Sequence, residues 1–280
     1  MKTSSRRDFF KKVSLGMVAA AITPDVVGSG VISAPEILPG SAKGANDRIR
    51  IAVLGVNGRG LSHIDEIMKI SKEYNVELAA LCDPDMDVLQ KRAEKVKSKY
   101  GKKVHIEQDF RKVYDDKEID AVTLATPNHW HALQTIWACQ SGKDVYVEKP
   151  ATHNIYEGRK MIEAAYKYNR IVQHGVQLRS SVAIREAVQH LKSGLIGRVY
   201  MSRGVVYRWR PDIGNKGISQ KPAGLDYDLW CGPAPVVPFT KNLVHYNWHW
   251  HWNYGNGDVG NQGIHETDLC LWGLGLDHLP

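Results

Sequence analysis

Cysteine is scarce in this sequence of 280 residues, and the spacing of the few cysteines matches no metal-binding or disulfide motif. The four are far apart, and no two of them have Cys-x-x-Cys spacing: Cys82, Cys139, Cys231 and Cys270. Cys82 and Cys139 lie in apolar stretches with strand-like and helix-like patterns. We therefore expect these two thiols to be part of a hydrophobic core rather than of a disulfide or a reactive site.

Long apolar runs and runs of like charge are also absent. Without a membrane-spanning run, we expect no stable membrane anchor. The formal net charge is +7, but the basic residues are scattered among acidic ones. This mixture is typical of a solvated surface, so we expect no nucleic-acid partner. The remaining composition is that of an ordinary globular protein with one large or two modest domains.

The N-terminus differs from the rest of the chain. Arg6 and Arg7 precede two phenylalanines and two lysines, and the apolar, uncharged stretch 13–22 follows. This order resembles a twin-arginine signal, which exports proteins that have already folded, although a disordered basic tail is the alternative. No cysteine follows the apolar stretch, which argues against a lipoprotein anchor. We expect 1–46 to be a signal and linker, and the protein to act in the periplasm or cell envelope.

From residue 49 onward the sequence alternates between two patterns. Continuous apolar runs, typical of strands buried on both faces of a parallel sheet, occur at 49–55, 76–83, 120–126, 144–150 and 170–175. Helical patterns lie between them at 62–70, 86–100, 131–142 and 155–168. The alternation predicts a doubly wound α/β sheet over 47–176 and a second domain over 177–280. Ligands of such sheets bind beyond the carboxyl ends of the strands.

The residues that follow the first two strands indicate a dinucleotide site. The first strand is followed by a glycine-rich loop with the residues Gly55, Val56, Asn57, Gly58, Arg59 and Gly60. It matches the dinucleotide fingerprint except at Asn57, which tolerates a left-handed backbone better than most residues. Asp83 ends the second strand and suits the ribose hydroxyls of NAD better than the 2′-phosphate of NADP. Alone, the loop is a weak signal, and Asp83 has helix capping as an alternative role.

Several further motifs occur in an order that resembles one enzyme family. They are GVNGRG (55–60), CDPD (82–85), TPNHWH (126–131), EKP (148–150), GLDYDLWCGPAP (224–235) and GNGDVGNQGIHETD (255–268). Together they are similar to the Gfo/Idh/MocA family, which includes glucose–fructose oxidoreductase and inositol dehydrogenase. The resemblance implies a Rossmann domain followed by an α/β domain with an open, largely antiparallel sheet. The family normally continues beyond this point, so we expect a truncated chain and, at full length, a homo-oligomer.

The resemblance also assigns roles to residues. It implies that Lys149, with a cis bond to Pro150, lies beside the nicotinamide and the substrate, and that His265 transfers a proton. Asn261 stands where the family has aspartate, and we expect it to orient an imidazole or a substrate hydroxyl. Because it cannot act as a carboxylate base, Asp258 is a candidate substitute. The resemblance and the glycine loop together place these further residues at the cofactor: Thr126, Pro127, Asn128, His131, Glu148 and Gln177. By composition alone, Asn128 could cap a helix, His129 and His131 could be ligands or polar surface, and Glu148 could form an exposed ion pair.

The second domain contains a stretch with a period of two. Residues 243–255 alternate aromatic with His or Asn side chains, and 197–209 also has strand character. The alternation fits an aromatic core face with a polar face, or a carbohydrate site in which rings stack on sugars. A metal site at His249 and His251 ranks third, because no carboxylate or cysteine is paired with them. The candidate substrate residues are Arg179, Trp209, His249 and His251.

These patterns lead to one main expectation and two alternatives. We expect an exported NAD-dependent oxidoreductase of a sugar, polyol or glycoside that keeps its cofactor bound and recycles it. The first alternative is an NAD-dependent glycosidase that oxidises its substrate transiently and cleaves it by elimination. The second is a sugar-binding relative without catalysis.

Overall fold

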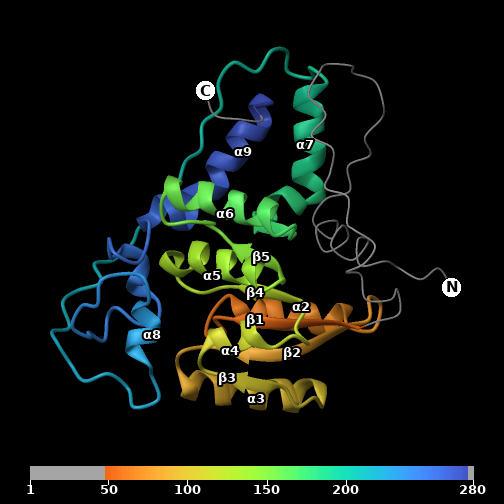
Figure 1. Ribbon diagram of the computed structural model, residues 1–280. Helices are drawn as coiled ribbons and strands as arrows, with labels where there is room; N and C mark the ends of the chain where they lie inside the picture. Colours follow the sequence, from red (N-terminus) through yellow and green to blue (C-terminus); the bar gives the residue numbers. More distant parts are fainter. Residues whose placement is uncertain (1–47, 277–280) are drawn as a thin grey trace.

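The computed structural model describes residues 48–276 (Figure 1). The expected signal and linker at 1–46 lie outside these residues. The chain alternates strands and helices as far as residue 175, and helices and loops follow. The strands are β1 (Ile49–Leu54), β2 (Val76–Cys82), β3 (His105–Glu107), β4 (Ala121–Leu124), β5 (Asp144–Glu148) and β6 (Val172–Gly175). The helices among them are α2 (Gly60–Ile70), α3 (Met86–Tyr100), α4 (Phe110–Asp115), α5 (Asn128–Gln140) and α6 (Ile155–Lys167).

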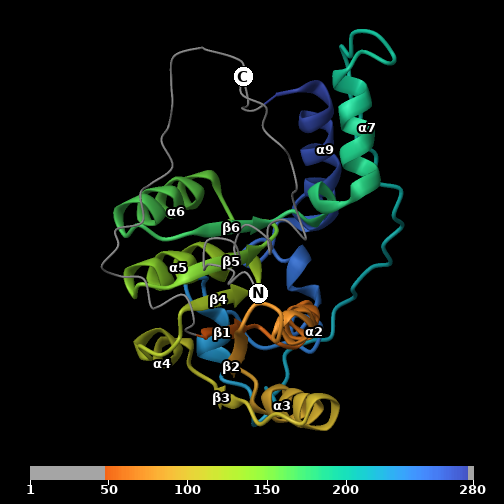
Figure 2. The same ribbon diagram turned by 90° about the vertical axis from the view of Figure 1, so that its right-hand side faces the viewer.

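The strands form one parallel sheet in the order β3-β2-β1-β4-β5-β6 (Figure 2). This order confirms the predicted α/β class and the Rossmann-like sheet. The central strands are buried because aliphatic residues face both sides, as in β1 with its sequence IRIAVL. The sequence patterns located all of these strands except β3, which is three residues long and lies at the edge of the sheet.

Helices cover both faces of the sheet, and each face has its own core (Figure 2). On one face, α2 and α3 pack over the sheet through Ile64, Ile67, Leu89 and Val96. On the other face lie α4, α5 and α6, together with Cys82 and Cys139. Both thiols are buried, as expected for core cysteines, and burial raises the pKa of the Cys139 thiol to about 11.

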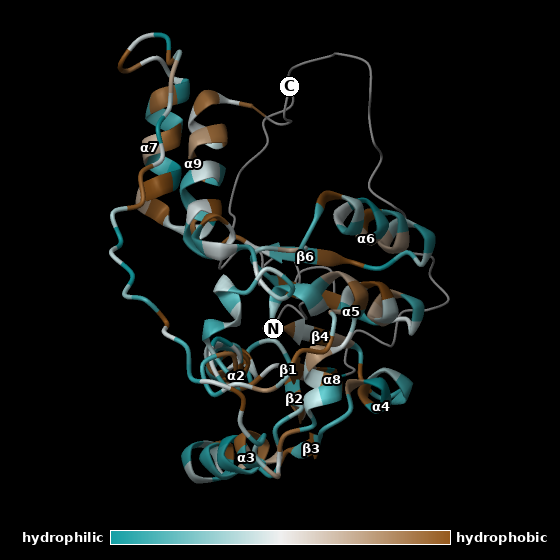
Figure 3. Cartoon of the chain, turned by 90° about the vertical axis from the view of Figure 1, so that its left-hand side faces the viewer, coloured by the Kyte–Doolittle hydropathy of each residue, from teal (hydrophilic) through white to brown (hydrophobic). Residues whose placement is uncertain are grey.

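The chain after β6 is mostly helical and irregular. It contains the 3₁₀ turns η2 (Gln177–Ser180) and η3 (Asn247–Trp250), and the π-helical turn η4 (Val259–Gly263). The α-helices of this part are α7 (Val182–Lys192), α8 (Tyr227–Cys231) and α9 (Ile264–Leu274). In Figures 1 and 2, α7 and α9 lie side by side, and Figures 1 and 3 show α8 beside one end of the sheet. No helix within 48–276 is long and apolar enough to cross a bilayer.

Both strand predictions for the second domain are wrong, and no described residue after 175 belongs to a strand. The stretch 198–210 lies outside regular secondary structure and is largely exposed, because no neighbouring strand pairs with its backbone. The stretch 243–255 turns back on itself: the Trp248 N–H donates to Leu243 O, and the His251 N–H to Trp248 O. The described residues therefore do not form the antiparallel sheet that the resemblance implies.

Candidate functional site

A cavity of about 450 Å³ lies at the carboxyl ends of the parallel strands. One wall is formed by the segments that follow β1, β2, β4 and β5, and the opposite wall by residues between 229 and 265. Most of the predicted site residues line it: Gly55, Asn57, Gly58, Arg59, Asp83, Thr126, Pro127, Asn128, His131, Glu148, Lys149, Gln177, His249, Asn261 and His265. The fold thus brings residues that are far apart in the sequence to one site, where open α/β sheets bind ligands.

The glycine loop is packed too tightly for side chains at two of its positions. Gly55 has a φ of +81°, and a Cβ there would lie 2.7 Å from the backbone of Ala125 and Thr126. A Cβ at Gly60 would lie 2.0 Å from the carbonyl oxygen of Gly55. A Cβ at Gly58 would meet open space. The first and last glycines of the loop are therefore required by its approach to β4 and by the start of α2.

Asn57 does not need the tolerance of a left-handed backbone on which the sequence argument relied. The described non-glycine residues with positive φ are Asn75 and Asn169, so the turn passes residue 57 in an ordinary conformation. Arg92 of α3 holds the loop by donating from Nε to Val56 O at 2.9 Å and from Nη2 to Asn57 O. Asparagine therefore fits at residue 57 without strain.

Asp83 binds the glycine loop and lines the cavity. Its Oδ2 accepts from the Val56 N–H at 2.9 Å, and its Oδ1 accepts from the Asp85 N–H at 3.1 Å. Burial raises the pKa of this carboxyl, although the two backbone hydrogen bonds oppose the shift. Asp85, not Asp83, caps α3, because its side chain accepts from the N–H groups of Asp87 and Val88. The capping alternative for Asp83 is therefore wrong.

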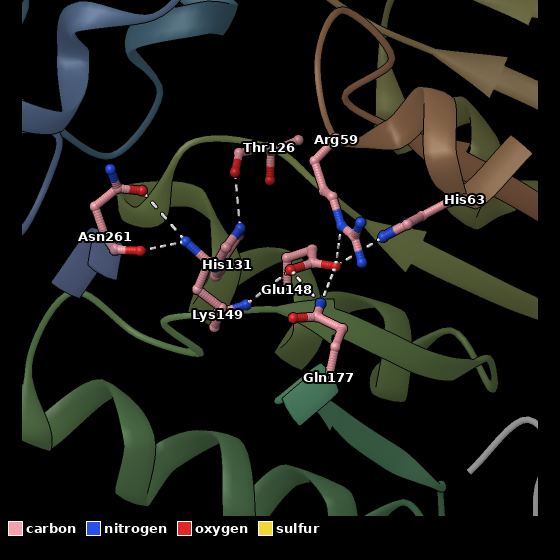
Figure 4. A network of polar contacts seen from close by, with 8 residues as sticks. All are labelled: Arg59, His63, Thr126, His131, Glu148, Lys149, Gln177 and Asn261. Carbon is pink, nitrogen blue, oxygen red and sulfur yellow. Dashed lines mark hydrogen bonds and ion pairs between the residues drawn. The ribbon is translucent and has the colours of Figure 1, made fainter. Parts of the chain in front are cut away.

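Lys149 extends from the end of β5 toward the opposite wall (Figure 4). Its peptide bond to Pro150 is cis, as the resemblance implies. The ammonium Nζ donates to Asn261 O at 2.6 Å and to Asn261 Oδ1 at 3.2 Å. Burial lowers the pKa of this amine, and the nearby Arg59 charge acts in the same direction, whereas Glu148 opposes it. The amine is thus fixed inside the crevice of the glycine turn.

Glu148 is the centre of a buried polar network beside Lys149 (Figure 4). Its Oε1 accepts from Arg59 Nε at 2.8 Å and from Gln177 Nε2 at 2.7 Å, and lies 2.9 Å from His63 Nε2. Burial alone would raise the pKa of this carboxyl, but His63 and Arg59 overcome it and lower the pKa to about 2. Only 4% of the residue is exposed, so the alternative of an exposed ion pair is wrong.

His129 and His131 are buried structural contacts rather than polar surface. His131 places Nδ1 2.6 Å from Pro150 O and Nε2 2.7 Å from Thr126 O, and so joins the ends of β4 and β5. His129 faces the carbonyl oxygens of Trp230 and Tyr254, which belong to the opposite wall. Burial lowers the pKa of His129 to about 4, although both carbonyls oppose the shift. Burial also lowers the pKa of His131, so it favours the neutral form of both rings, which has one N–H to donate.

Asn128 does not cap α5, as one sequence argument proposed. Pro127 is the N-cap residue and makes no side-chain cap hydrogen bond. Asn128 instead donates from Nδ2 to Asn256 Oδ1 at 2.9 Å, and Asn256 donates to His153 O at 2.8 Å. These contacts attach the second half of the chain to the loops that follow β4 and β5.

His265 stands in the first turn of α9, directly after the π-helical turn η4. It lines the cavity, and its buried Nδ1 has no hydrogen-bond partner among residues 48–276. Burial lowers the pKa of His265, and the Lys149 charge lowers it further. A neutral imidazole thus lines the cavity, and one of its ring nitrogens is buried without a partner among the described residues. π-Helical turns often occur at functional sites.

The supporting residues act differently from the expectation. Asn261 was expected to orient an imidazole or a substrate hydroxyl, but its oxygens hold the Lys149 amine. Asp258 was expected to replace a missing carboxylate at the site. Its carboxylate pairs with Arg210 at 3.0 Å, and it is not among the described residues that line the cavity.

Among the four candidate substrate residues, His249 lines the cavity, and the described lining does not include the other three. Arg179 binds Asp268 through two contacts of 2.8 Å. Trp209 is 86% exposed on the unpaired stretch, and His251 lies outside the lining. The predicted strand had placed His249 and Trp248 on opposite faces. In η3 their rings stack, with centroids 3.7 Å apart, and both line the cavity.

Sequence reasoning missed several residues of the cavity. They are mostly aromatic side chains and residues next to Asp83: Pro84, Gln108, Phe110, Trp130, Trp230, His245, Tyr246 and Trp248. Trp230 belongs to a motif that carried the family resemblance, so that motif was a usable signal. A Cβ at Gly232 of the same motif would lie 2.0 Å from the Trp130 ring, which explains the glycine. Gln108 and Phe110 follow the short strand β3, which had itself been missed.

Comparison with known proteins decides the family. The model of the Gfo/Idh/MocA oxidoreductase family, NAD-binding Rossmann fold, matches residues 49–176. The model of the C-terminal α/β domain of the same family matches residues 180–279. The chain belongs to the Gfo/Idh/MocA oxidoreductase family. The expectation of an NAD-binding domain is thereby confirmed.

Individual Gfo/Idh/MocA relatives are similar over part of the chain. An α-N-acetylgalactosaminidase of Shewanella oneidensis is 31% identical over 175 residues, which are 59% of this chain and 38% of that protein. A glycosyl hydrolase family 109 protein of Shewanella sp. (strain MR-4) is 27% identical over the same share of each chain. The aligned part thus spans well under half the length of these relatives.

One solved structure similar in fold is the WlbA dehydrogenase from Bordetella pertussis, in complex with NADH and UDP-GlcNAcA. Its TM-score is 0.62 at 22% identity, and the match covers 80% of this chain and 57% of that one. At this identity the likeness shows the fold alone.

Proposed function

We propose that this chain belongs to an exported NAD-dependent oxidoreductase that acts on a hydroxyl-bearing carbon of a sugar, polyol or glycoside. The observation that carries the proposal is the position of Lys149. Its amine is held by Asn261 inside the cavity that the glycine turn lines, and the imidazole of His265 lines the same cavity. An ammonium and a neutral imidazole in one enclosed site are the groups that such a reaction requires.

The residues of this cavity suit NAD. Gly55 allows the tight turn after β1 and Gly60 the close packing at the start of α2 that a dinucleotide-binding loop needs, and both are constrained by packing. Asp83 offers carboxylate oxygens at the end of β2, where they would bind ribose hydroxyls and repel the 2′-phosphate of NADP. The residues near Lys149 would face the nicotinamide ribose. We therefore infer that NAD, rather than NADP, is the cofactor.

The chemistry divides between the cofactor and the side chains. NAD⁺ bound in this cavity supplies a hydride acceptor for the carbon that bears the hydroxyl. The Lys149 ammonium stabilises negative charge on the substrate oxygen and orients it. His265 takes the hydroxyl proton on its imidazole, because the residue lines the cavity and burial favours its neutral form.

The cavity lining supports a carbohydrate or polyol as substrate. Trp248 and His249 present stacked rings, and His265 presents a polar edge on the same wall. Rings together with a few convergent polar groups are typical of small-molecule pockets, and flat aromatic faces suit sugar C–H groups. The name of one relative points to the same class, since it is an α-N-acetylgalactosaminidase.

Export and retention of the cofactor complete the proposal. The twin-arginine pattern at 1–46 predicts that the protein leaves the cytoplasm folded. A cell envelope offers little free nicotinamide cofactor, so an exported enzyme has to carry its NAD with it and restore it within the site. The folded-state export route is suited to such a protein.

A glycosidase that carries NAD is a second candidate. It is favoured by the 31% identity to an α-N-acetylgalactosaminidase. Such an enzyme oxidises and re-reduces the same substrate, so that cleavage occurs without net change of NAD. The two candidates differ in what accumulates: an oxidoreductase yields an oxidised sugar, and a glycosidase yields a free sugar and its leaving group.

The test begins with purified, exported protein that is denatured to release any bound nucleotide. We expect NAD in the supernatant; its absence from folded protein would refute cofactor retention. A substrate screen follows the absorbance of the reduced nicotinamide and, in parallel, the release of a chromogenic aglycone. Lys149→Ala should retain NAD and lose cofactor reduction, whereas Lys72→Ala, on the exposed surface, should be unchanged. Full reduction by Lys149→Ala would remove the role assigned to this amine.

A further inference from the structure

One wall of the cavity is fastened to the turn that follows β2. The Met86 N–H donates to Gly224 O at 3.0 Å, and the Asp226 N–H donates to Pro84 O at 2.9 Å. Gln108 bridges the two chain segments of this contact, because its Nε2 donates to Pro84 O at 2.7 Å and to Gly224 O at 2.9 Å. The start of the α8 segment is therefore held against the Rossmann half close to Asp83.

A side-chain contact fastens the same wall at a second point. His245 places Nε2 2.9 Å from Asp85 Oδ2. Asp85 is buried, with 4% of the residue exposed, and its Oδ1 accepts from the backbone of Asp87 and Val88 at the start of α3. The carboxylate that caps α3 thus also holds the segment that leads into η3. With its proton on Nε2, the imidazole donates to a charged acceptor, and such hydrogen bonds are stronger than neutral ones.

The Asp85–His245 contact lies at one end of the cavity. Asp83, Pro84 and Gln108 line the cavity from the Rossmann side, and His245 and Tyr246 line it from the opposite side. The segment that His245 anchors therefore lies across this end of the cavity from Asp83 and Pro84. In the proposed function, Asp83 faces the adenosine ribose, so a bound dinucleotide could leave at this end only after the segment moved.

We propose that the Asp85–His245 contact is a latch that slows the release of NAD. The inference rests on the proposed function, and it assigns cofactor retention to the contact between His245, which lines the cavity, and Asp85, which follows the lining residues Asp83 and Pro84. Neither residue is required to contact the reacting carbon. Loss of one charge-assisted hydrogen bond typically costs about 1.5–3 kcal/mol, which corresponds to a roughly 10- to 100-fold faster release.

The experiment measures NADH dissociation rather than turnover. NADH is bound to the purified protein, an excess of NAD⁺ is added, and the decay of NADH fluorescence gives the release rate. Asp85→Asn removes the charge but keeps a good N-cap for α3, because asparagine and aspartate cap helices about equally well. His245→Ala removes the other partner from a more exposed position, and so tests the latch even if Asp85→Asn folds poorly.

Each single variant should release NADH roughly 10- to 100-fold faster, and the double variant should be no faster than the singles. Asp109→Asn is the matched control, because Asp109 caps α4 in the same way and is not among the described residues of the cavity lining. It should leave the release rate unchanged. Melting temperatures of all variants show whether the fold is retained.

Three results would overturn the latch. Unchanged release in both single variants would remove it while leaving the proposed function intact. Rates that multiply in the double variant would show that the two residues act separately, for example through a direct contact of His245 with the nucleotide. If wild-type protein binds no NADH, the proposed function fails and the latch fails with it.

Discussion

The two walls of the cavity are stabilised in different ways. The sheet wall is formed by the segments that follow strands with continuous backbone hydrogen bonding and a hydrophobic core on each face. The opposite wall packs around one smaller aromatic cluster, which includes Trp230, Trp248 and Tyr254. It is joined to the sheet wall by separate polar contacts, such as Lys149–Asn261 and Asp85–His245.

Because the two walls are stabilised differently, we expect changes in them to affect different properties of the protein. Changes in the sheet wall disturb a cooperative ladder and its cores, so they should reduce the free energy of unfolding. Changes in the polar contacts between the walls should alter cofactor release or proton transfer and have smaller effects on folding. The following variants test this separation, in order of decreasing expected effect.

Gly60→Ala should have the largest effect, because the new Cβ would lie 2.0 Å from the carbonyl oxygen of Gly55. The opposing atom belongs to the backbone and cannot rotate away, so we expect a loss of more than about 4 kcal/mol or failure to fold. Thermal and urea unfolding measure it. Gly58→Ala is the control, since its Cβ meets open space. Equal stability of the two variants would contradict this account of the turn.

Glu148→Gln should destabilise the protein at pH 7 by on the order of 3 kcal/mol, because the carboxylate is held at a lowered pKa by His63 and Arg59. The pKa falls from 4.5 to about 2 on folding. The stabilisation is therefore complete above about pH 5 and disappears as the pH falls toward 2. Urea unfolding at pH 7 and pH 3 measures the difference between variant and wild type. A difference that does not shrink at pH 3 would show that the charge is not its source.

Asn261→Asp should change the pH dependence of the reaction more than the stability. Burial lowers the pKa of Lys149, and a carboxylate near the 3.2 Å position of Oδ1 would raise it. The limb of the pH profile that reports loss of the Lys149 proton should then move to higher pH. Asn154→Asp, at the exposed start of α6, serves as the control. If this limb of the pH profile does not move, it reports the ionisation of a group other than Lys149.

Trp209→Ala should have the smallest effect. Its side chain is exposed on an unpaired stretch outside the described cavity lining, so we expect a change in unfolding free energy within about 0.5 kcal/mol. NADH affinity should also be unchanged in a fluorescence titration. A clear loss of NADH affinity would show that Trp209 contributes to the binding site, contrary to its exposed position in the structure.

The sequence was informative where structure depends on neighbouring residues. Buried aliphatic runs located β1, β2, β4, β5 and β6, since a strand buried on both faces needs only its own side chains to be recognised. The residues after those strands could be assigned to one edge of the sheet because parallel strands share a direction. On this basis the sequence predicts that Gly55 and Asp83 lie at one edge of the sheet, and the family resemblance adds Lys149 to them.

The same reasoning failed for 243–255, where a period of two predicted a strand. A strand needs a partner with free backbone groups, and the sequence does not say whether one is present. In the structure, local hydrogen bonds form η3, and the rings of Trp248 and Tyr254 pack into a cluster with Tyr227 and Trp230. Alternation of His and Trp residues therefore described composition and not geometry.

By itself, the sequence determined the Rossmann sheet, the glycine turn and the amine at the end of β5, because each follows from short-range pattern and chain direction. Only the tertiary structure decided which distant residues complete the site. Asn261 reaches Lys149 across 112 positions of the chain, and His245 reaches Asp85 across 160. Such pairings depend on how the second half of the chain packs over the first, and this packing is set by many weak contacts at once rather than by any local signal.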